Sequence, residues 1–465
     1  MRNNPNTYLI QVITLFSSFL FASCNSGITE EMVSKNIAKE LLIEDLNYLI
    51  EEVEKRHVDL YERANKDSLL LIKNQILNSI TEDLNRNQFY KIIARINPYF
   101  NDAHCLVFPL REEASFQKEA GFSVFPFHVI LDENWILRPE RSYKRASDGA
   151  FVDKSWSISS INGVKAEDLI DSIANYSHGE TETLRRHMTT LLFSDWLFSI
   201  FGWSGDFEIT FNQDFKSLRI DSDDIWNSLE RNVVQFNRLE ILDNNVGYLR
   251  LGSFDVDEHK NQYEDFIENS FDSLSSLGVK KLVIDVRGNT GGQSGAGELV
   301  LKYLTDKKLS QVSQMFDRIH EENAGIFNYR GNPGDLKEVS MGSGELIKPN
   351  RPEKQFKGET VVLFDEMTYS AGIIFITIVQ DHKIAKTVGR PTGGFANQTG
   401  NIESFQLPNS KLTVYVPSRK FVRVNGDKSI HPVVPDFIIL NSDSTLTSED
   451  RILEFGINVL NDRSL

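Results

Sequence analysis

The segment Thr360–Val379 constrains the fold of this chain more than any other stretch. Five apolar or β-branched residues, Thr360–Phe364, predict a buried strand; a polar turn follows, and then an apolar stretch long enough for a helix. Ser370 is therefore expected at the mouth of that helix, where free backbone N–H groups and the helix dipole favour the negative charge of an oxyanion. The alternative is that Ser370 is only a helix N-cap.

A second strand-to-turn segment lies upstream. Lys281–Val286 predicts a buried strand, and it leads directly into the glycine-rich stretch Arg287–Gly292. Still earlier, Val246–Leu251 predicts a strand and Tyr263–Leu277 an amphipathic helix. Because strand and helix alternate, residues 237–440 are expected to form a layered α/β sheet with its site beyond the strand ends.

The N-terminal part of the chain is helical in pattern. Between Glu30 and about Phe100, apolar residues recur at helical spacing and polar residues fill the other faces. This pattern predicts a helical layer that packs on a larger structure. Asn101–Phe108 is then expected to lead from a turn into a strand, and the tail Ser448–Leu460 to form one closing helix.

The stretch from about Gly121 to Phe211 is expected to form short strands and turns, with strands at Phe122–Leu131, Ser155–Ile161 and Phe207–Phe211. Within it, Trp156–Ile170 predicts a strand, an Asn-Gly turn and the start of a helix. This stretch resembles a PDZ domain, a fold that takes an extended peptide as an added strand. The alternative is an α/β insert that binds nothing.

Composition limits the class of protein. The length of 465 residues suggests two to four domains, and 40% hydrophobic with 25% charged residues is ordinary for a globular protein with ample core. The net charge of −16 argues against nucleic acid or an anionic membrane surface as the main partner. The composition identifies neither a substrate nor an oligomeric state.

The N-terminus has the pattern of a targeting segment. Arg2 supplies a positive end, and Tyr8–Ala22 is an apolar stretch too short to span a bilayer comfortably. It ends in small residues before Cys24, which resembles a bacterial lipobox whose cysteine becomes acylated. Phe21 stands where a lipobox usually has leucine, so cleavage by an ordinary signal peptidase is the alternative. Cys105 is the one other cysteine, so a mature lipoprotein would have no internal disulfide.

Three ordered segments carry a family resemblance: Leu282–Gly292, Thr368–Gly372 with Val388–Gly394, and Val433–Asp436. Together they resemble the C-terminal processing (tail-specific) serine peptidase family. The resemblance implies a crotonase-like α/β catalytic sheet, a polypeptide substrate and an exported location.

The same family resemblance extends to the helical start of the chain, to the Asp102–His104 turn and to Ser160–Gly163, so it covers nearly the whole mature chain.

Each part of the expected site has a chemical reason. A serine hydroxyl needs a base within hydrogen-bond reach and donors for the developing oxyanion, and Ser370 would attack. The N–H of Ala371 at the helix start is one natural donor. Gly291 and Gly292 bring a second N–H close, because no side chain blocks the approach. By resemblance, the oxyanion hole is built from this glycine turn and the residue after the nucleophile.

The identity of the base divides the family. One branch uses a lysine just after a Thr-x-Gly turn, where this chain has Phe395, and Lys383 and Lys386 are expected to point away from the nucleophile. The other, tricorn-core-like branch takes a histidine from an upstream turn, and His104 fits it. A neutral imidazole accepts the proton of Ser370 at physiological pH. The alternative for His104 is a capping or core residue.

The match to the tricorn-core-like branch is incomplete. Ala103 stands where that branch has a serine before its histidine, and Ser429 or its neighbours stand where an orienting glutamate is expected. Glu403 and Asp102 are the candidate substitutes. Gly372 and the following isoleucine also replace an Ala-Glu pair of relatives. These departures imply activity that is weak, narrowly specific or lost.

Other chemistries fit the sequence less well. The nine histidines show no metal-ligand spacing, so neither a metal nor a cofactor is expected. Neighbouring strand residues point to opposite faces, which disfavours a pair of Cys105 with His104. Gly288–Gly295 lacks the ending of a phosphate-binding loop. Asp285 and Arg287 are expected to fix the glycine turn by hydrogen bonds.

The sequence therefore predicts an α/β protein with a crotonase-like layered catalytic sheet, an N-terminal helical layer and a PDZ-like insert. The expected parts are a lipoprotein signal peptide (residues 1–23), an N-terminal helical region (24–110), a PDZ-like region (115–230), a serine peptidase catalytic domain (235–445) and a C-terminal helix (446–465). The expected function is an exported serine endopeptidase, lipid-anchored in a bacterial cell envelope, that cleaves polypeptides near their C-termini. The alternative is a peptide-binding lipoprotein on the same fold.

Overall fold

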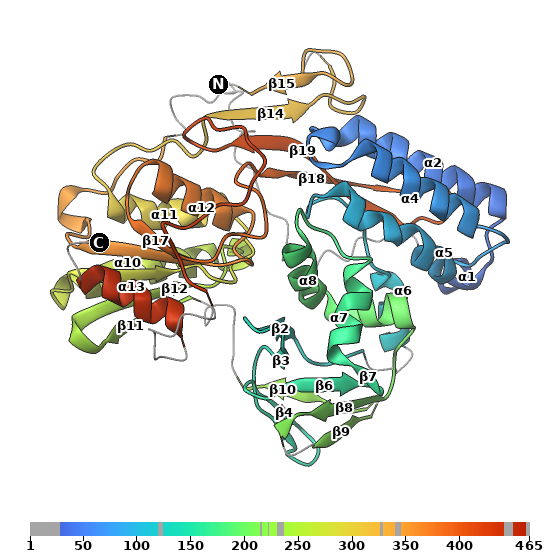
Figure 1. Cartoon of the computed structure of the whole chain (residues 1–465), viewed down its shortest axis with the longest axis horizontal. Helices are drawn as coiled ribbons and strands as arrows, with labels where there is room; N and C mark the ends of the chain where they lie inside the picture. Colours follow the sequence, from blue (N-terminus) through green and yellow to red (C-terminus); the bar gives the residue numbers. More distant parts are fainter. Residues whose placement is uncertain are drawn as a thin grey trace, which may run out of the picture. The chain divides into compact units, whose positions relative to one another are not determined.

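A computed structural model describes residues 28–119, 124–213, 216–221, 223–229, 237–325, 329–339, 346–440 and 450–461 (Figure 1). These residues fall into two compact units. The Ser370 unit comprises the described residues of 232–402 and 417–465, and the His104 unit those of 23–231 and 403–416. The predicted signal peptide and Cys24 lie outside the described residues. In the described part of the chain, no helix has the length and apolarity needed to cross a membrane.

The Ser370 unit is built on a six-stranded sheet in the order β11-β12-β13-β16-β17-β20. Its strands are β11 (Asn237–Leu242), β12 (Val246–Leu251), β13 (Lys281–Asp285), β16 (Glu359–Phe364), β17 (Lys386–Gly389) and β20 (Phe437–Ile438). β11 pairs antiparallel with β12, and every other neighbouring pair is parallel. This arrangement confirms the predicted α/β class, and the predicted strand Val246–Leu251 is correct to the residue.

Helices lie on both sides of this sheet. They are α10 (Lys260–Ser276), α11 (Ser294–Leu304), α12 (Ala371–Asp381) and α13 (Arg451–Asn461). α13 packs Ile452 and Leu460 on the face that carries Val283 and Val361, while α11 and α12 lie on the other side (Figure 1). Because β13 and β16 are parallel neighbours, the turns that follow them meet at one edge of the sheet.

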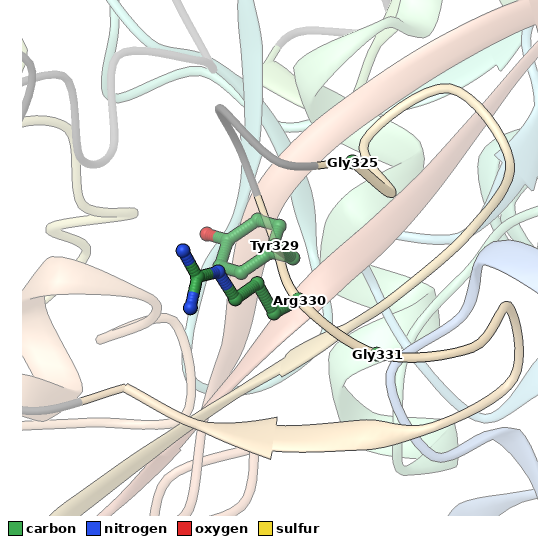
Figure 2. Close-up of a pocket in the computed structure, with 4 residues that line it drawn as sticks. All are labelled: Gly325, Tyr329, Arg330 and Gly331. Carbon is green, nitrogen blue, oxygen red and sulfur yellow. The ribbon is translucent and has the colours of Figure 1, made fainter.

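An antiparallel extension adds β14 (Gln314–Arg318) and β15 (Leu336–Glu338), with β14 paired to the end of β19. Beside it is a cavity of about 360 Å³ lined by Gly325, Tyr329, Arg330 and Gly331 (Figure 2). None of the predicted site residues is among these four.

The His104 unit begins with the helical layer that the apolar spacing predicts. Its helices are α1 (Glu30–Ser34), α2 (Lys39–Arg56), α3 (Leu60–Arg63), α4 (Lys66–Ser79), α5 (Arg86–Ile93) and the 3₁₀ segment η2 (Ala94–Phe100). α2 buries Leu42, Leu46, Leu49 and Val53 along one stripe. A turn, the short strand β1 (Leu106–Val107) and α6 (Arg111–Glu119) follow.

The described residues in the remaining part of this unit form three small sheets. The four-stranded one has the order β7-β6-β8-β9 and contains β6 (Ile158–Ile161), β7 (Val164–Lys165), β8 (Phe207–Phe211) and β9 (Ser217–Ile220). Asn162 and Gly163 form the predicted turn, with φ of 49° and 76°, and α7 (Ala166–Ala174) follows β7. The smaller sheets contain β2 (Val129–Leu131) and β3 (Leu137–Pro139), and β4 (Tyr143–Arg145), β5 (Phe151–Val152) and β10 (Trp226–Ser228).

Two sequence expectations for this region are wrong. The expected strand Phe122–Leu131 is shorter, because its described residues before Val129 form no strand. The expectation of strands and turns up to Phe211 also misses α8 (Glu182–Leu191), α9 (Phe193–Trp196) and the π-helical turn η3 (Leu197–Phe201). The sequence also predicts that this region binds an extended peptide, as a PDZ domain does, and this stays a prediction.

The long strands β18 (Thr399–Gln406) and β19 (Thr413–Val422) carry the chain out of the Ser370 unit after Ile402 and back at Pro417. The turn between them belongs to the His104 unit and is fastened to α2 by a buried carboxylate. Asp45 accepts hydrogen bonds from Asn409 N (2.9 Å), Asn409 Nδ2 (3.0 Å) and Ser410 N (2.7 Å). Since Asp45 is fully buried, these three donors replace the water it loses.

Replacement of Asp45 by alanine should therefore destabilise the His104 unit, because Asp45→Ala leaves three donors without their acceptor. We expect a loss of about 2–4 kcal/mol in the free energy of unfolding, measured by urea titration. Glu40→Ala, at an exposed position on the same helix, is the matched control and should change the free energy by less than about 0.5 kcal/mol. Equal effects of the two substitutions would contradict this account of the turn.

Candidate functional site

Ser370 occupies the position immediately before α12, as the sequence predicts. Its backbone has φ 51° and ψ −120°, a region that side-chain-bearing residues rarely adopt. Its hydroxyl makes no hydrogen bond that caps the helix. The N-cap interpretation therefore does not account for this serine, whose strained backbone points to a function.

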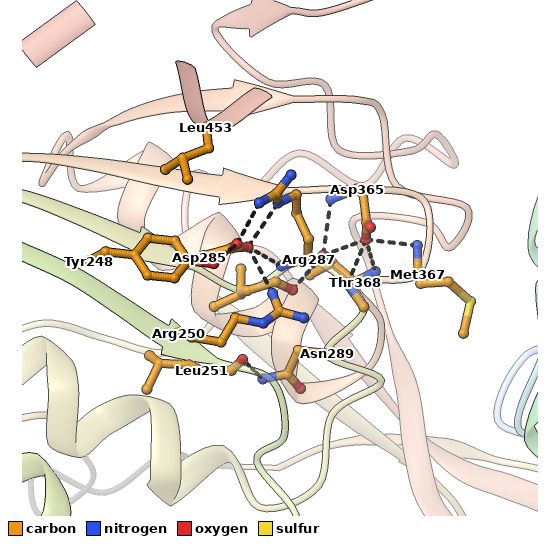
Figure 3. Close-up of polar contacts among 12 residues, drawn as sticks. Tyr248, Arg250, Leu251, Asp285, Arg287, Asn289, Asp365, Met367, Thr368 and Leu453 are labelled. Carbon is orange, nitrogen blue, oxygen red and sulfur yellow. Dashed lines mark hydrogen bonds and ion pairs between the residues drawn. The ribbon is translucent and has the colours of Figure 1, made fainter. Parts of the chain in front are cut away.

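The turn before Ser370 is fastened to the turn after β13. The carboxylate of Asp365 accepts hydrogen bonds from the N–H groups of Gly288 (2.8 Å), Met367 (3.1 Å) and Thr368 (3.1 Å) (Figure 3). Thr368 in turn donates its hydroxyl to the carbonyl oxygen of Val286 at 2.9 Å. These bonds cross-link the two strand ends and fix the start of α12 against the glycine turn.

The glycine turn comes within contact distance of Ser370. A Cβ added to Gly291 would lie 2.7 Å from Ser370 Cβ and 2.9 Å from the nitrogen of Ala371. One added to Gly292 would lie 2.3 Å from the nitrogen of Asp255. Both glycines also have positive φ, 103° and 126°, so no other residue fits without displacing the backbone. The structure thus brings Gly291, Gly292, Ser370 and Ala371 together.

The backbone N–H groups of Gly291 and Gly292 differ in whether they already donate a hydrogen bond. The N–H of Gly291 donates to Asn289 Oδ1 at 2.9 Å. Within the described residues, neither the N–H of Gly292 nor that of Ala371 has a hydrogen-bond partner. Gly292 and Ala371 are therefore the amides that remain able to bind an oxyanion beside Ser370.

An ion-pair cluster around the buried carboxylate of Asp285 lies at the start of this glycine turn. Asp285 accepts hydrogen bonds from Tyr248 Oη (2.7 Å), Arg250 Nη1 (2.8 Å) and Arg287 Nη2 (2.7 Å) (Figure 3). Burial acts to raise the pKa of Asp285, but the two arginines outweigh it and hold the pKa below its ordinary value. Arg287 also binds Asp450, which leads into α13. The predicted structural role of Asp285 and Arg287 agrees with these contacts.

His104, in the other unit, lies in a tightly bonded turn and is 2% exposed. Its N–H donates to Asp102 Oδ1 at 2.8 Å, and its Nδ1 lies 3.7 Å from the same oxygen. The carbonyl oxygen of Ala103 accepts a hydrogen bond from Nδ1 of His178 at 2.6 Å. Asp102 is thus placed beside the imidazole, whereas Ala103 contributes only its backbone.

Asp102 is fully buried and has further partners on its second oxygen. His57 Nε2 lies 3.3 Å and Arg63 Nε 3.8 Å from Oδ2. Burial acts to raise the pKa of Asp102, but His57 and Arg63 outweigh it and lower the pKa, so the group is a carboxylate.

The electrostatics leave His104 neutral at pH 7. Burial is the main cause that lowers the pKa of His104 to about 4; Arg63 and His57 act in the same direction, and Asp102 opposes them. A neutral imidazole in this position is able to accept a proton.

The other candidates have different surroundings. Glu403 lies in β18 and the His104 unit, with Oε2 3.7 Å from Arg56 Nη1. Lys383 and Lys386 are exposed, and Ser429 donates its hydroxyl to Asp427 at 2.6 Å. His57, Arg63 and His178 around the Asp102–His104 turn were not predicted, because no spacing in the sequence relates them to that turn. In the described residues, no group of three or more His, Cys, Asp or Glu side chains could hold a metal ion.

Known proteins resemble this chain in sequence and in fold. Residues 245–439 match the sequence model described as Peptidase family S41. Over 222 residues the chain is 25% identical to the carboxy-terminal processing protease CtpA of Bacillus subtilis (strain 168), which covers 45% of this chain and 41% of that protein. The chain thus spans less than half the length of this relative.

Solved structures extend the likeness in fold to most of the chain. The crystal structure of mature CPAF superimposes with a TM-score of 0.60 at 13% identity, covering 91% of this chain and 96% of that one. Mature CPAF complexed with lactacystin gives 0.59 at 14% identity, over 91% and 97%. At these identities the likeness establishes a shared mixed α/β fold.

The backbone strain at Ser370 makes a stability prediction. Ser370→Gly should be more stable than Ser370→Ala by about 1 kcal/mol, because glycine tolerates positive φ and alanine does not. Urea unfolding of the two variants measures the difference. Ser294, at the start of α11 and outside the positive-φ positions, is the matched control: there glycine should be less stable than alanine. The same order at both positions would refute strain at Ser370.

Proposed function

We propose that this chain is a serine endopeptidase that cleaves polypeptides near their C-termini through an acyl-enzyme, because residues 245–439 match the sequence model of peptidase family S41. One observation carries the proposal. A serine with strained backbone stands at a helix start, and beside it the amides of Gly292 and Ala371 have no partner in the described residues. That combination serves acyl transfer, because the amides stabilise the charge that forms when the serine attacks.

In the proposed reaction, Ser370 Oγ attacks the carbonyl carbon of the scissile peptide bond. The carbonyl oxygen becomes an oxyanion and accepts hydrogen bonds from the N–H groups of Ala371 and Gly292. Collapse of this intermediate breaks the C–N bond and leaves an ester on Ser370. Water then attacks the ester through a second oxyanion in the same place, which releases the peptide and restores the hydroxyl.

We assign the general base to His104. Its neutral imidazole would take the proton of Ser370 and give it to the leaving amine, then repeat the exchange with water. The carboxylate of Asp102, 3.7 Å from Nδ1, would stabilise the imidazolium that forms between these steps. The assignment requires the imidazole of His104 to reach the hydroxyl of Ser370 in the active protein.

Preference for C-termini rests on two supports. The relative CtpA is named a carboxy-terminal processing protease, and the sequence pattern of residues 115–230 resembles that of a PDZ domain. Such a domain takes a peptide as an added strand. We propose that this region holds the substrate while Ser370 cleaves it.

A fluorophosphonate probe tests the chemistry, since it labels only an activated serine. We expect covalent labelling of the wild type, none of Ser370→Ala, and at least about 100-fold slower labelling of His104→Gln. His128→Gln, at an exposed histidine of the same unit, should label normally. Full activity of His104→Gln would mean that another group is the base.

The pH dependence follows from the lowered pKa of His104. The base is neutral above its pKa of about 4 and protonated below it, so labelling should be constant from pH 8 to 5 and fall as the pH drops through about 4. The rate constant of labelling against pH measures this, with circular dichroism at each pH as the control for folding. Half-loss near pH 6.5 would show that burial does not govern the base.

A second function is a peptide-binding protein without catalysis. The observation that favours it is the replacement of the branch's orienting serine and glutamate by Ala103 and Ser429. No labelling of a folded wild type, with retained binding of C-terminal peptides, would support this function instead.

We also propose an exported location with a lipid anchor on Cys24, supported by the apolar stretch Tyr8–Ala22 and the small residues before the cysteine. Two or more acyl chains would hold the protein on a membrane, where one would bind only marginally. In a bacterial host, radiolabelled palmitate should enter the wild type but not Cys24→Ser, and only the wild type should sediment with membranes. Equal incorporation into both would contradict the anchor.

A further inference from the structure

His57 completes a buried arrangement around the Asp102–His104 turn. It follows α2 directly, its N–H donates to the carbonyl oxygen of Val53 at 2.8 Å, and it is fully buried. We propose that His57 is a positioning residue that holds the Asp102 carboxylate against the His104 imidazole, in the role that a serine and a glutamate fill in the related branch. This inference rests on the proposed function and deepens it.

The hydrogen bonds of His57 define its tautomer. The N–H of Asp59 donates to His57 Nδ1 at 3.1 Å, so Nδ1 carries no proton. A neutral imidazole then carries its proton on Nε2, the atom that lies 3.3 Å from Asp102 Oδ2. His57 therefore directs its Nε2–H side toward Asp102 Oδ2, and the bond at Nδ1 fixes this ring orientation.

The two oxygens of Asp102 divide their partners. Oδ1 accepts the N–H of His104 at 2.8 Å and faces its Nδ1 at 3.7 Å. Oδ2 is held by His57, with Arg63 Nε at 3.8 Å. Because each oxygen is held from its own side, the carboxylate cannot rotate away from His104 without losing a contact. Removal of His57 would free one of these sides.

The carboxylate of Asp102 favours the protonated form of His104 that arises during the reaction, whereas burial and Arg63 oppose it. Arg63 also contacts a second buried carboxylate, Glu180, at 3.2 Å, so its one positive charge faces two carboxylates. A proton that arrives on His104 adds the second positive charge in a site that excludes water. The arrangement therefore suits a base that is neutral at rest and becomes cationic in the transition state.

Among the residues that the structure describes, the groups that act on His104 come from four places: its own turn (Asp102), the end of α2 (His57), α3 (Arg63) and the loop after α7 (His178). His178 donates from Nδ1 to the carbonyl oxygen of Ala103, and burial lowers the pKa of His178 to about 4. His178 thus holds the backbone of the turn as a neutral group, whereas His57 is the histidine directed at the carboxylate.

The test compares His57→Phe, His57→Gln and His57→Asn in fluorophosphonate labelling across pH 4–8. Phenylalanine keeps the volume but removes the donor. Glutamine places an amide N–H near the position of Nε2, and the shorter asparagine does not reach it. We expect at least tenfold slower labelling of His57→Phe and His57→Asn, and recovery to within a few-fold of the wild type in His57→Gln. His128→Gln is again the control.

The pH midpoint separates positioning from mere stability. Asp102 acts to raise the pKa of His104, so a His57 variant that no longer holds this carboxylate in place should move the acid limb of the labelling profile to lower pH. If His57 only stabilised the fold, its replacement would lower the midpoint of unfolding and leave the pH midpoint of labelling unchanged. Wild-type rate and pH midpoint in folded His57→Phe, or in folded His57→Asn if the phenylalanine variant does not fold, would overturn the inference.

The inference and the proposed function can fail separately. If the wild type shows no labelling that depends on Ser370, the proposed function fails. An NMR titration of the ring nitrogens of His104 then still decides the inference, because it needs no activity. A shifted midpoint in a His57 variant supports positioning by His57, and an unchanged midpoint overturns it.

Discussion

The Ser370 unit depends on the pairing of two parallel strands, β13 and β16, whose ends open at the same edge of the sheet. Parallel pairing alone brings two turns near each other; the carboxylate of Asp365 and the carbonyl of Asn289, which accepts the N–H of Tyr369 at 2.9 Å, join them. The glycine turn and the helix start thereby become one rigid element. A site that must bind a short-lived charge benefits from this rigidity, because its amides need no rearrangement when the charge appears.

The two units stabilise charge by different means. Around Ser370, the backbone supplies uncharged donors, and the ionised groups Asp285 and Arg287 lie beneath the turn. Around His104, buried ionised side chains surround the imidazole directly. Buried charges are costly unless they are paired, so the second arrangement adds little to stability. Its value is the electrostatic environment that it creates for one histidine.

The sequence predicts the parts of this fold that local pattern controls. The strand Phe207–Phe211 and the Asn162–Gly163 turn were predictable because alternation and turn chemistry are local. The helices between Glu182 and Phe201 were not, since their apolar residues follow a region of short strands and continue into a run without clear periodicity. The positions of Ser370 and of the glycine turn were predictable because each lies in the turn that follows a buried strand.

The surroundings of Asp102 show where sequence reasoning ends. Several helices separate His57 and Arg63 from Asp102 in the chain. Only the packing of the N-terminal helical layer brings both side chains to the Asp102 carboxylate. A similar limit applies to the glycine turn. The sequence gives no means to tell Gly291 from Gly292, because the difference arises from a side-chain bond of Asn289 to the first of them.

The fastening of Asn409 and Ser410 to Asp45 has a consequence for how this protein is made. These residues are 364 and 365 positions apart in the chain, so the ribosome completes the hairpin long after α2 has emerged. At about 5–20 residues per second, α2 waits on the order of tens of seconds for its partner. During synthesis the apolar face of the N-terminal helical layer is exposed until residues of the β18–β19 hairpin pack on it. A chaperone that binds apolar surface is able to bind this face during that interval. No contiguous piece of the gene encodes the finished His104 unit, so it cannot be inherited or transplanted as a simple cassette.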